Sequence, residues 1–108
     1  MTPVLVFDIE TIPDVDGLRR LHDHPASMSD AEVAEHAFAA RREKSGTDFL
    51  PHYLQRVAAI SCVLRRTQRD GSAVFHVGSL GTLEDGEATL IQKFYELIAR
   101  YSPQLVSW

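Results

Sequence analysis

Two carboxylates near the amino terminus have the types and the spacing of a metal site. Asp8 and Glu10 follow the apolar run Val4–Phe7, which is typical of a buried strand. Strand side chains alternate between faces, so the two acids share one face, roughly 6.5–7 Å apart along the chain. Like charges on a half-buried surface repel each other and lose hydration. Mg²⁺ or Mn²⁺ offsets both costs, because hard oxygen ligands suit these ions.

The pair therefore indicates a metal site at the carboxyl end of a strand, where ligand sites of α/β sheets lie. The alternative is that Asp8 and Glu10 only end the strand, one in solvent and one in a turn.

Length and composition are those of one small globular domain. The chain has 108 residues, of which 44% are apolar and 24% charged, and its formal net charge is −4. No overall attraction to nucleic acid follows from that charge, although a bound metal reverses the sign locally. Cys62 is the only cysteine and lies in an apolar run, so we expect a buried, inert thiol. The chain has neither a signal peptide nor the ~18–20 apolar residues that cross a bilayer, which predicts a cytoplasmic protein without membrane contact.

The elements that must position the acids begin with a strand and its exit over residues 1–12, after which Pro13 stops the ladder and starts a turn. Residues 15–24 form a short predicted helix, and residues 29–44 form a longer one, because Ser29 and Glu32 have the spacing of a capping box. A loop over residues 45–52 follows, in which Phe49 and Leu50 are expected to point inward.

The charged and titratable residues of this helical region are expected to lie on a solvent-exposed surface. Arg41, Arg42 and Lys44 suit the carboxyl end of a helix, and the alternative is that they face a phosphate backbone. The three histidines lack a metal-ligand spacing, so we expect surface positions rather than ligands; they are His22, His24 and His36.

The second half of the sequence predicts a strand over residues 57–64, a turn at Asp70-Gly71 and a returning strand over residues 73–77. A helix capped by Thr82 or Asp85 then runs to about Tyr101. Its apolar positions recur at three and four residues: Leu90, Ile91, Phe94, Leu97, Ile98 and Tyr101. Residues 104–108 start another strand. The prediction is therefore an α/β fold with three antiparallel strands, the first beside the second, then a helix and a strand beside the first.

Several strings in this order support a family resemblance. Phe7-Asp8-Ile9-Glu10-Thr11 resembles the first motif of the DEDD 3′–5′ exonucleases. The longer string over residues 6–14, with Leu50-Pro51 and residues 55–61 downstream, resembles the branch related to the proofreading domain of family-B DNA polymerases. The resemblance implies a ribonuclease H-like fold, with residues 1–108 as the amino-terminal portion of one exonuclease domain and a mostly helical insertion at about residues 13–52.

The resemblance also implies chemistry. Asp8 and Glu10 are expected to be catalytic ligands of two Mg²⁺ or Mn²⁺ ions, and Ile9 and Thr11 to lie against the 3′-terminal nucleotide. The expected partner is a single-stranded or frayed 3′ end of DNA, with RNA as the alternative, hydrolysed by a two-metal mechanism.

The family's second motif follows the strand that matches residues 105–108, with an Asn-rich turn and a Phe-Asp pair that carries the third acid. A later helix supplies a Tyr or His and the fourth acid. This chain ends one residue short of the second motif, so we expect an amino-terminal piece with little or no activity alone. Its exposed carboxyl-terminal strand favours self-association.

Two other classes of protein share parts of this pattern. Phosphatases of the haloacid dehalogenase type require Asp-x-Asp after the first strand, and Glu10 argues against them. A non-catalytic module that keeps the fold to bind nucleic acid or protein stays open, because half of the family's acids are missing and no basic patch is evident.

Overall fold

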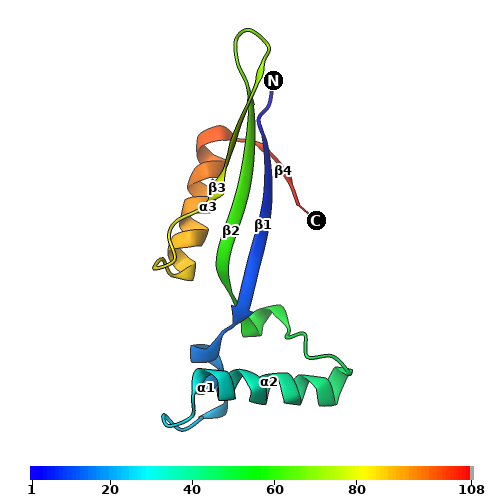
Figure 1. The fold of residues 1–108 in the computed structure, drawn as a ribbon, viewed down its shortest axis with the longest axis vertical. Coiled ribbons are helices and arrows are strands. Elements are labelled where there is room, and N and C mark those ends of the chain that lie inside the picture. The colour runs from blue at the N-terminus through cyan, green and yellow to red at the C-terminus, as the bar shows by residue number, and fades with distance from the viewer. Residues whose placement is uncertain (108) are drawn as a thin grey trace. The chain divides into compact units, whose positions relative to one another are not determined.

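Four strands form one sheet in the order β3-β2-β1-β4. The computed structural model describes residues 1–107. Its strands are β1 (Val4–Pro13), β2 (Gln55–Thr67), β3 (Ala73–Ser79) and β4 (Gln104–Val106). Figure 1 shows β1 and β2 running in opposite directions. β3 is antiparallel to β2, and β4 is parallel to β1. The predicted α/β order is therefore confirmed, while Trp108, placed in the last predicted strand, lies outside the described residues.

The chain divides into two compact units, each with its own core. The sheet unit comprises Met1–Glu10 and the chain from Val57 onward, and the helical unit comprises Thr11–Arg56. No helix within residues 1–107 has the length and apolar content needed to cross a membrane.

The turn between β2 and β3 forms where Asp70-Gly71 predicts it. Gly71 adopts a positive φ of 87°, which glycine reaches without a steric cost. The Asp70 carboxylate accepts hydrogen bonds from the Ser72 hydroxyl at 2.6 Å and the Ser72 backbone N–H at 2.9 Å. These two hydrogen bonds hold the pKa of Asp70 below its usual range, and the bond from the hydroxyl has the larger effect.

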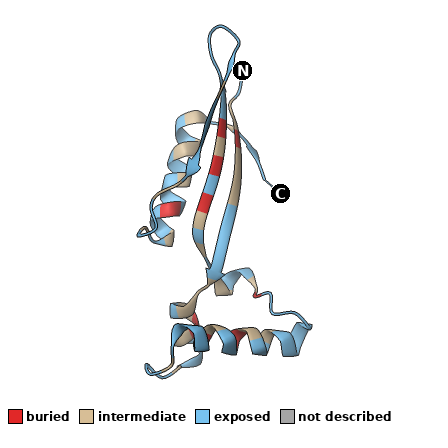
Figure 2. Ribbon diagram, in the orientation of Figure 1, coloured by how far each residue is buried: buried red, intermediate tan, exposed pale blue. Residues whose placement is uncertain are grey.

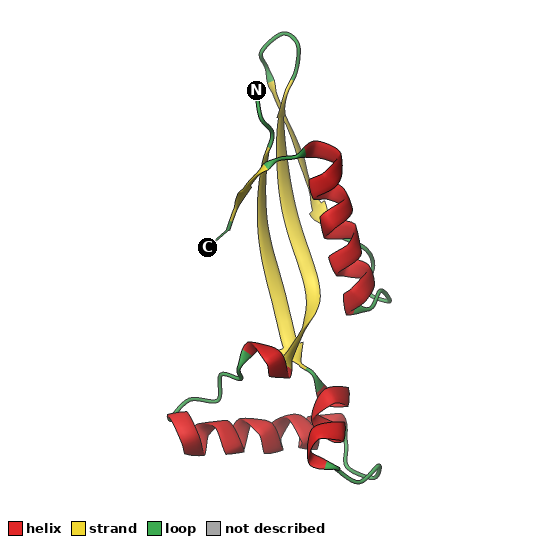
Figure 3. Ribbon diagram, turned by 180° about the vertical axis from the view of Figure 1, so that it is seen from behind, coloured by secondary structure: helices red, strands yellow, loops and turns green. Residues whose placement is uncertain are grey.

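Helix α3 (Glu87–Tyr101) covers one face of the sheet, as Figure 1 and Figure 3 show from opposite sides. Buried residues alternate along β2 (Figure 2), as expected for a strand with one covered face. The core of the sheet unit consists of Leu5, Ile60, Cys62, Leu64 and Leu90. Cys62 is buried as predicted, and burial raises the pKa of its thiol.

The predicted apolar face of α3 is confirmed except at one position. Five of its six predicted residues belong to the core or pack against it, among them Phe94, whose ring centroid lies 4.9 Å from that of Phe7. Ile91 remains 37% exposed, because one residue along a helix turns the side chain by about 100° away from Leu90.

The predicted cap of α3 is wrong. The helix begins at Glu87 with Gly86 as its N-cap. The Asp85 carboxylate instead accepts the backbone N–H of Thr82 at 2.8 Å and the Lys93 ammonium at 3.2 Å. The hydrogen bond from the Thr82 N–H has the largest effect and that from Lys93 the next, and together they hold the pKa of Asp85 below its usual range. Asp85 therefore closes the turn before the helix rather than capping its first residues.

The helical unit contains α1 (Val15–His22), α2 (Asp30–Ser45) and a short 3₁₀ turn at His52–Leu54. Both predicted helices are confirmed. Asp14 caps α1 by accepting the Gly17 N–H, and the Ser29 hydroxyl caps α2 by accepting the Glu32 N–H at 3.2 Å.

The core of the helical unit consists of Leu18, Val33, Ala37 and Leu50. Leu50 points inward as predicted, whereas Phe49 is 67% exposed. Neighbouring residues of an extended chain point to opposite sides, so only one of the two can enter the core.

Candidate active site

Asp8 and Glu10 lie inside β1 rather than at its end, which corrects the expected position. β1 continues to Pro13. In the helical unit, the Thr11 hydroxyl donates to the Gln55 side-chain oxygen, and the Asp14 N–H donates to the Leu54 carbonyl at 2.9 Å. Within residues 1–107, the last residue of β1 paired with β4 is Val6. The two acids therefore lie just beyond the parallel ladder, although the strand itself continues.

The two carboxylates are on the face of β1 opposite α3. Leu5 is fully buried and Phe7 packs against the same core. Because side chains alternate along a strand, Val6, Asp8 and Glu10 occupy the other face. Asp8 is half-buried and Glu10 is exposed. The predicted common face is therefore present in the strand.

Asp8 borders a shallow hollow on this face of the sheet. The hollow has a volume of about 280 Å³. Its walls come from β1, β2 and β3, with two serines and two valines among them: Ser61, Val63, Val77 and Ser79. The hollow places one carboxylate beside mostly apolar surface, where a charge is screened less by water than on an open strand.

Among the described residues of the sheet unit, neither carboxylate has a hydrogen-bond donor or a cation as partner. The oxygens of Asp8 and Glu10 are therefore available to a ligand. Hard carboxylate oxygens fit Mg²⁺ or Mn²⁺, and Mg²⁺ is commonly held by one or two carboxylates, with phosphate and water completing the shell. Across residues 1–107, however, no group of three or more His, Cys, Asp or Glu side chains is arranged to hold a metal ion.

Ile9 and Thr11, the predicted nucleotide contacts, flank Glu10 in β1. Ile9 is 41% exposed and, by strand alternation, belongs to the opposite face from Asp8. Thr11 already donates its hydroxyl to Gln55. The structure thus does not bring the Ile9 side chain to the face of the acids, and the role of both residues stays a prediction.

A cluster of three histidines was missed by the sequence argument. The ring centroid of His22 lies 5.7 Å from that of His24 and 6.0 Å from that of His36. The centroids of His24 and His36 are 4.8 Å apart. His22 and His36 are exposed as predicted, but His24 is only half-exposed, and its Nε2 atom is buried without a partner. Desolvation, then the nearby His36, His22 and Arg19, lower the pKa of His24. No sequence spacing reveals the cluster, because it forms where the end of α1 and the turn after it meet α2.

Comparisons with known proteins place the carboxyl-terminal part of the chain in a family. A model of a family described as a predicted 3′–5′ exonuclease related to the exonuclease domain of PolB matches residues 47–108. No curated protein and no solved structure matches the chain. The family match includes β2, β3, α3 and β4 and spans more than half of the chain. The chain therefore belongs to this family of predicted 3′–5′ exonucleases related to the exonuclease domain of PolB.

Proposed function

We propose that Asp8 and Glu10 are the metal-binding catalytic carboxylates of a 3′–5′ exonuclease acting on single-stranded or frayed 3′ ends of DNA, with RNA as the alternative. The observation that carries this proposal is their position. Both acids share the sheet face opposite α3, lie just past the described part of the β1–β4 ladder and have no partner among residues 1–10 and 57–107. Family membership supplies the reaction class.

Two Mg²⁺ or Mn²⁺ ions, when bound, supply an activated water and neutralise charge on the leaving 3′ oxygen. Asp8, the less exposed of the two acids, would help to hold both ions. Glu10 would hold one ion and help to orient the attacking water. The hollow beside Asp8 lowers the local exposure to water, which strengthens the interaction of the carboxylate with a cation.

The substrate contacts of this site are assigned to Ile9 and Thr11. Because the exposed Ile9 side chain belongs to the opposite face from Asp8, the backbone of Ile9 is the group assigned to the 3′-terminal nucleotide. Thr11 has its hydroxyl bonded to Gln55, so its backbone N–H is the group assigned to the terminal nucleotide.

The 108 residues alone are expected to have little or no nuclease activity. Residues 1–107 bring no third metal-binding side chain to Asp8 and Glu10, and two carboxylates can hold one ion weakly but not position two. Activity therefore requires further ligands from outside the described residues.

The proposal is tested by Mn²⁺ binding, followed by electron paramagnetic resonance. Wild-type protein is expected to bind Mn²⁺ weakly, and Asp8→Asn or Glu10→Gln to reduce the affinity about tenfold or more. Asp16→Asn, which changes an exposed acid of α1, is the matched control and should bind like wild type. Equal binding by all four proteins would exclude the metal site.

A nuclease assay with a 5′-labelled oligonucleotide and Mn²⁺ completes the test. We expect no shortening that depends on Asp8. Robust turnover that Asp8→Asn abolishes would confirm the catalytic site but contradict the expected inactivity of these 108 residues.

A second candidate function is a non-catalytic module that binds nucleic acid or protein. The lack of a third metal ligand in residues 1–107 favours it. Retained oligonucleotide binding without any Mn²⁺ binding would support this alternative over the exonuclease.

A further inference from the structure

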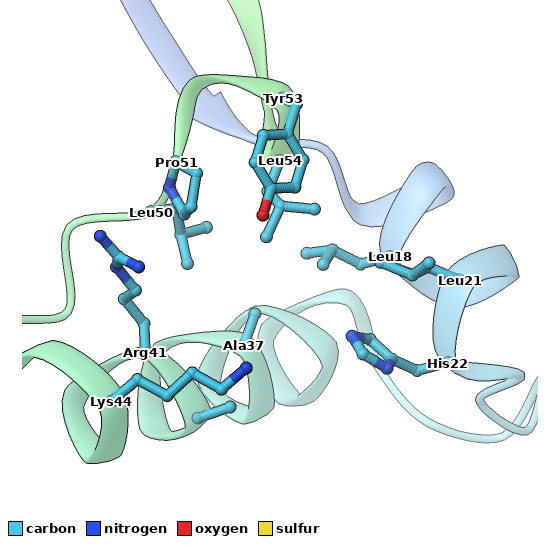
Figure 4. A pocket seen from close by; sticks show the side chains of 11 residues that line it. Leu18, Leu21, His22, Ala37, Arg41, Lys44, Leu50, Pro51, Tyr53 and Leu54 are labelled. Carbon is cyan, nitrogen blue, oxygen red and sulfur yellow. The ribbon is translucent and has the colours of Figure 1, made fainter.

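A pocket in the helical unit combines an apolar interior with a basic rim. Its volume is about 240 Å³. α1 contributes Leu18 and Leu21, and the segment before β2 contributes Leu50, Pro51 and Leu54. Figure 4 shows these side chains around a common hollow, with α2 along one side. The volume lies below the ~300–1,000 Å³ of pockets for drug-sized ligands and suits a single ring system.

Every charged side chain that lines this pocket is basic. Arg41 and Lys44 project from α2, and His22 lies across from them at the end of α1 (Figure 4). No carboxylate is among the lining residues. This local excess of positive charge contrasts with the net charge of −4 of the whole chain, so the pocket selects for an anionic ligand.

The two α2 cations differ from their neighbour Arg42 in being unpaired. Arg42 forms ion pairs with Glu35 at 2.7 Å and Asp48 at 3.6 Å. Within the helical unit, Arg41 and Lys44 have no acidic partner. The Arg41 Nε donates to the Phe49 carbonyl at 3.0 Å, which fixes the guanidinium while leaving its terminal N–H groups for a ligand. Fixed N–H groups of this kind suit phosphate oxygens.

Exposed apolar and aromatic surface surrounds the basic groups. Tyr53 is 80% exposed and Leu21 is 62% exposed, although both line the pocket. Exposed apolar surface beside a concave site is typical of a surface that a ligand covers. The ring of Tyr53 offers a flat face for stacking.

We propose that this pocket binds one nucleotide of a single-stranded nucleic acid, with the base in the apolar hollow beside Tyr53 and the phosphate at Arg41 and Lys44. The ligand class rests on the proposed exonuclease function, and the site itself is separate from Asp8 and Glu10. A nucleotide fits because it presents a flat ring and an anion a short distance apart. Stacking platforms combined with basic groups are the usual means of holding single strands without reading their sequence.

Binding of a short fluorescein-labelled single-stranded DNA, followed by anisotropy in EDTA, tests the pocket without any metal. The double variant Arg41→Gln/Lys44→Gln is expected to weaken binding about tenfold or more. Its slope of log affinity against log salt should fall by about 0.7, the value for the one phosphate of a single strand that the two cations neutralise. The matched control Arg69→Gln/Arg100→Gln removes two exposed cations of the sheet unit and should change binding less than threefold.

A second variant tests the hollow separately from the charges. Ala40 lines the pocket and is exposed on α2, so Ala40→Phe fills the hollow while keeping the basic rim. We expect about tenfold weaker binding, the size of one lost base stack, with an unchanged salt slope and an unchanged circular dichroism spectrum.

The outcomes separate the two proposals. Wild-type affinity in both the double variant and Ala40→Phe overturns the pocket, whatever Mn²⁺ does at Asp8. Saturable binding of a free mononucleotide without binding of the oligonucleotide also overturns it, because the pocket would then bind a small molecule and not a nucleic-acid strand. Pocket-dependent strand binding together with unchanged Mn²⁺ affinity in Asp8→Asn supports the pocket and removes the catalytic proposal.

Discussion

At the scale of single residues, His24 shows how packing changes the chemistry of a side chain. Its Nε2 atom is buried without a hydrogen-bond partner, and His22, His36 and Arg19 are the titratable and basic groups around it. A charged imidazole in this position is disfavoured by lost hydration and by like charge. The folded helical unit therefore holds His24 in its neutral form more firmly than the unfolded chain does.

Acidification is accordingly expected to destabilise the protein. The pKa of His24 is lowered from 6.5 in the folded state, so the unfolded state binds more protons once the pH falls below that value. The contribution to stability is complete above the unfolded pKa and is lost as the pH falls through 6.5 towards the folded pKa. Thermal unfolding followed by circular dichroism should show a lower Tm at about pH 5.5 than at about pH 7.5.

Two substitutions identify the group responsible for this pH dependence. His24→Gln should reduce the difference in Tm between the two pH values, whereas His76→Gln, an exposed histidine of β3, should leave it unchanged. The lowered pKa values of Asp70 and Asp85 change the stability only below about pH 4, which is outside the pH range of this experiment. An undiminished pH dependence in His24→Gln would contradict the assignment.

The candidate sites differ in how far a sequence can reveal them. Asp8 and Glu10 are visible because strand alternation fixes their common face from a spacing of two residues. The histidine cluster and the basic pocket are not visible, because His22, Arg41 and Lys44 come together only when α1 packs on α2. Their distances in sequence carry no periodic signal of that contact.

At the scale of elements, local signals explain which predictions were confirmed. Ser29, Asp70-Gly71 and the apolar repeat of α3 each act over a few residues, and each forms the expected cap, turn or face. Asp85 failed as a predicted cap because Lys93 and the Thr82 N–H compete for its carboxylate. β1 runs past the two acids to Pro13, and the next N–H, that of Asp14, donates to the Leu54 carbonyl. Local chemistry thus predicts the elements, and contacts distant in sequence set their ends.

The packing of α3 on the sheet gives a second prediction. Leu90 is 2% exposed in the core of the sheet unit, whereas its neighbour Ile91 is 37% exposed. Leu90→Ala leaves a cavity and should lower the free energy of unfolding by about 2–5 kcal/mol. Ile91→Ala should cost less than about 1 kcal/mol, because most surface substitutions have small effects. Urea unfolding followed by circular dichroism measures both, and equal losses would show that α3 does not pack as described.

At the scale of the whole molecule, the uncovered parts of the sheet are the main feature without a local explanation. Within the described residues of the sheet unit, α3 covers one face, while Val77 and Phe75 of β3 remain 79% and 60% exposed on the other. β4 forms one edge, with Leu105 47% and Val106 39% exposed. Exposed apolar faces and unpaired edges favour association with another chain, and a net charge of −4 opposes it only weakly at physiological salt.

We therefore expect the 108-residue chain to self-associate reversibly through this sheet surface. Sedimentation velocity should show a weight-average mass that rises with protein concentration. Val77→Lys places a charge on the open face and should lower the association constant about tenfold or more, since a buried unpaired charge is costly. Leu83→Lys is the matched control, because Leu83 is fully exposed in the connection before α3 and lies outside the sheet. A monomer at all concentrations, or equal effects of the two substitutions, would show that this surface remains exposed to solvent and does not mediate self-association.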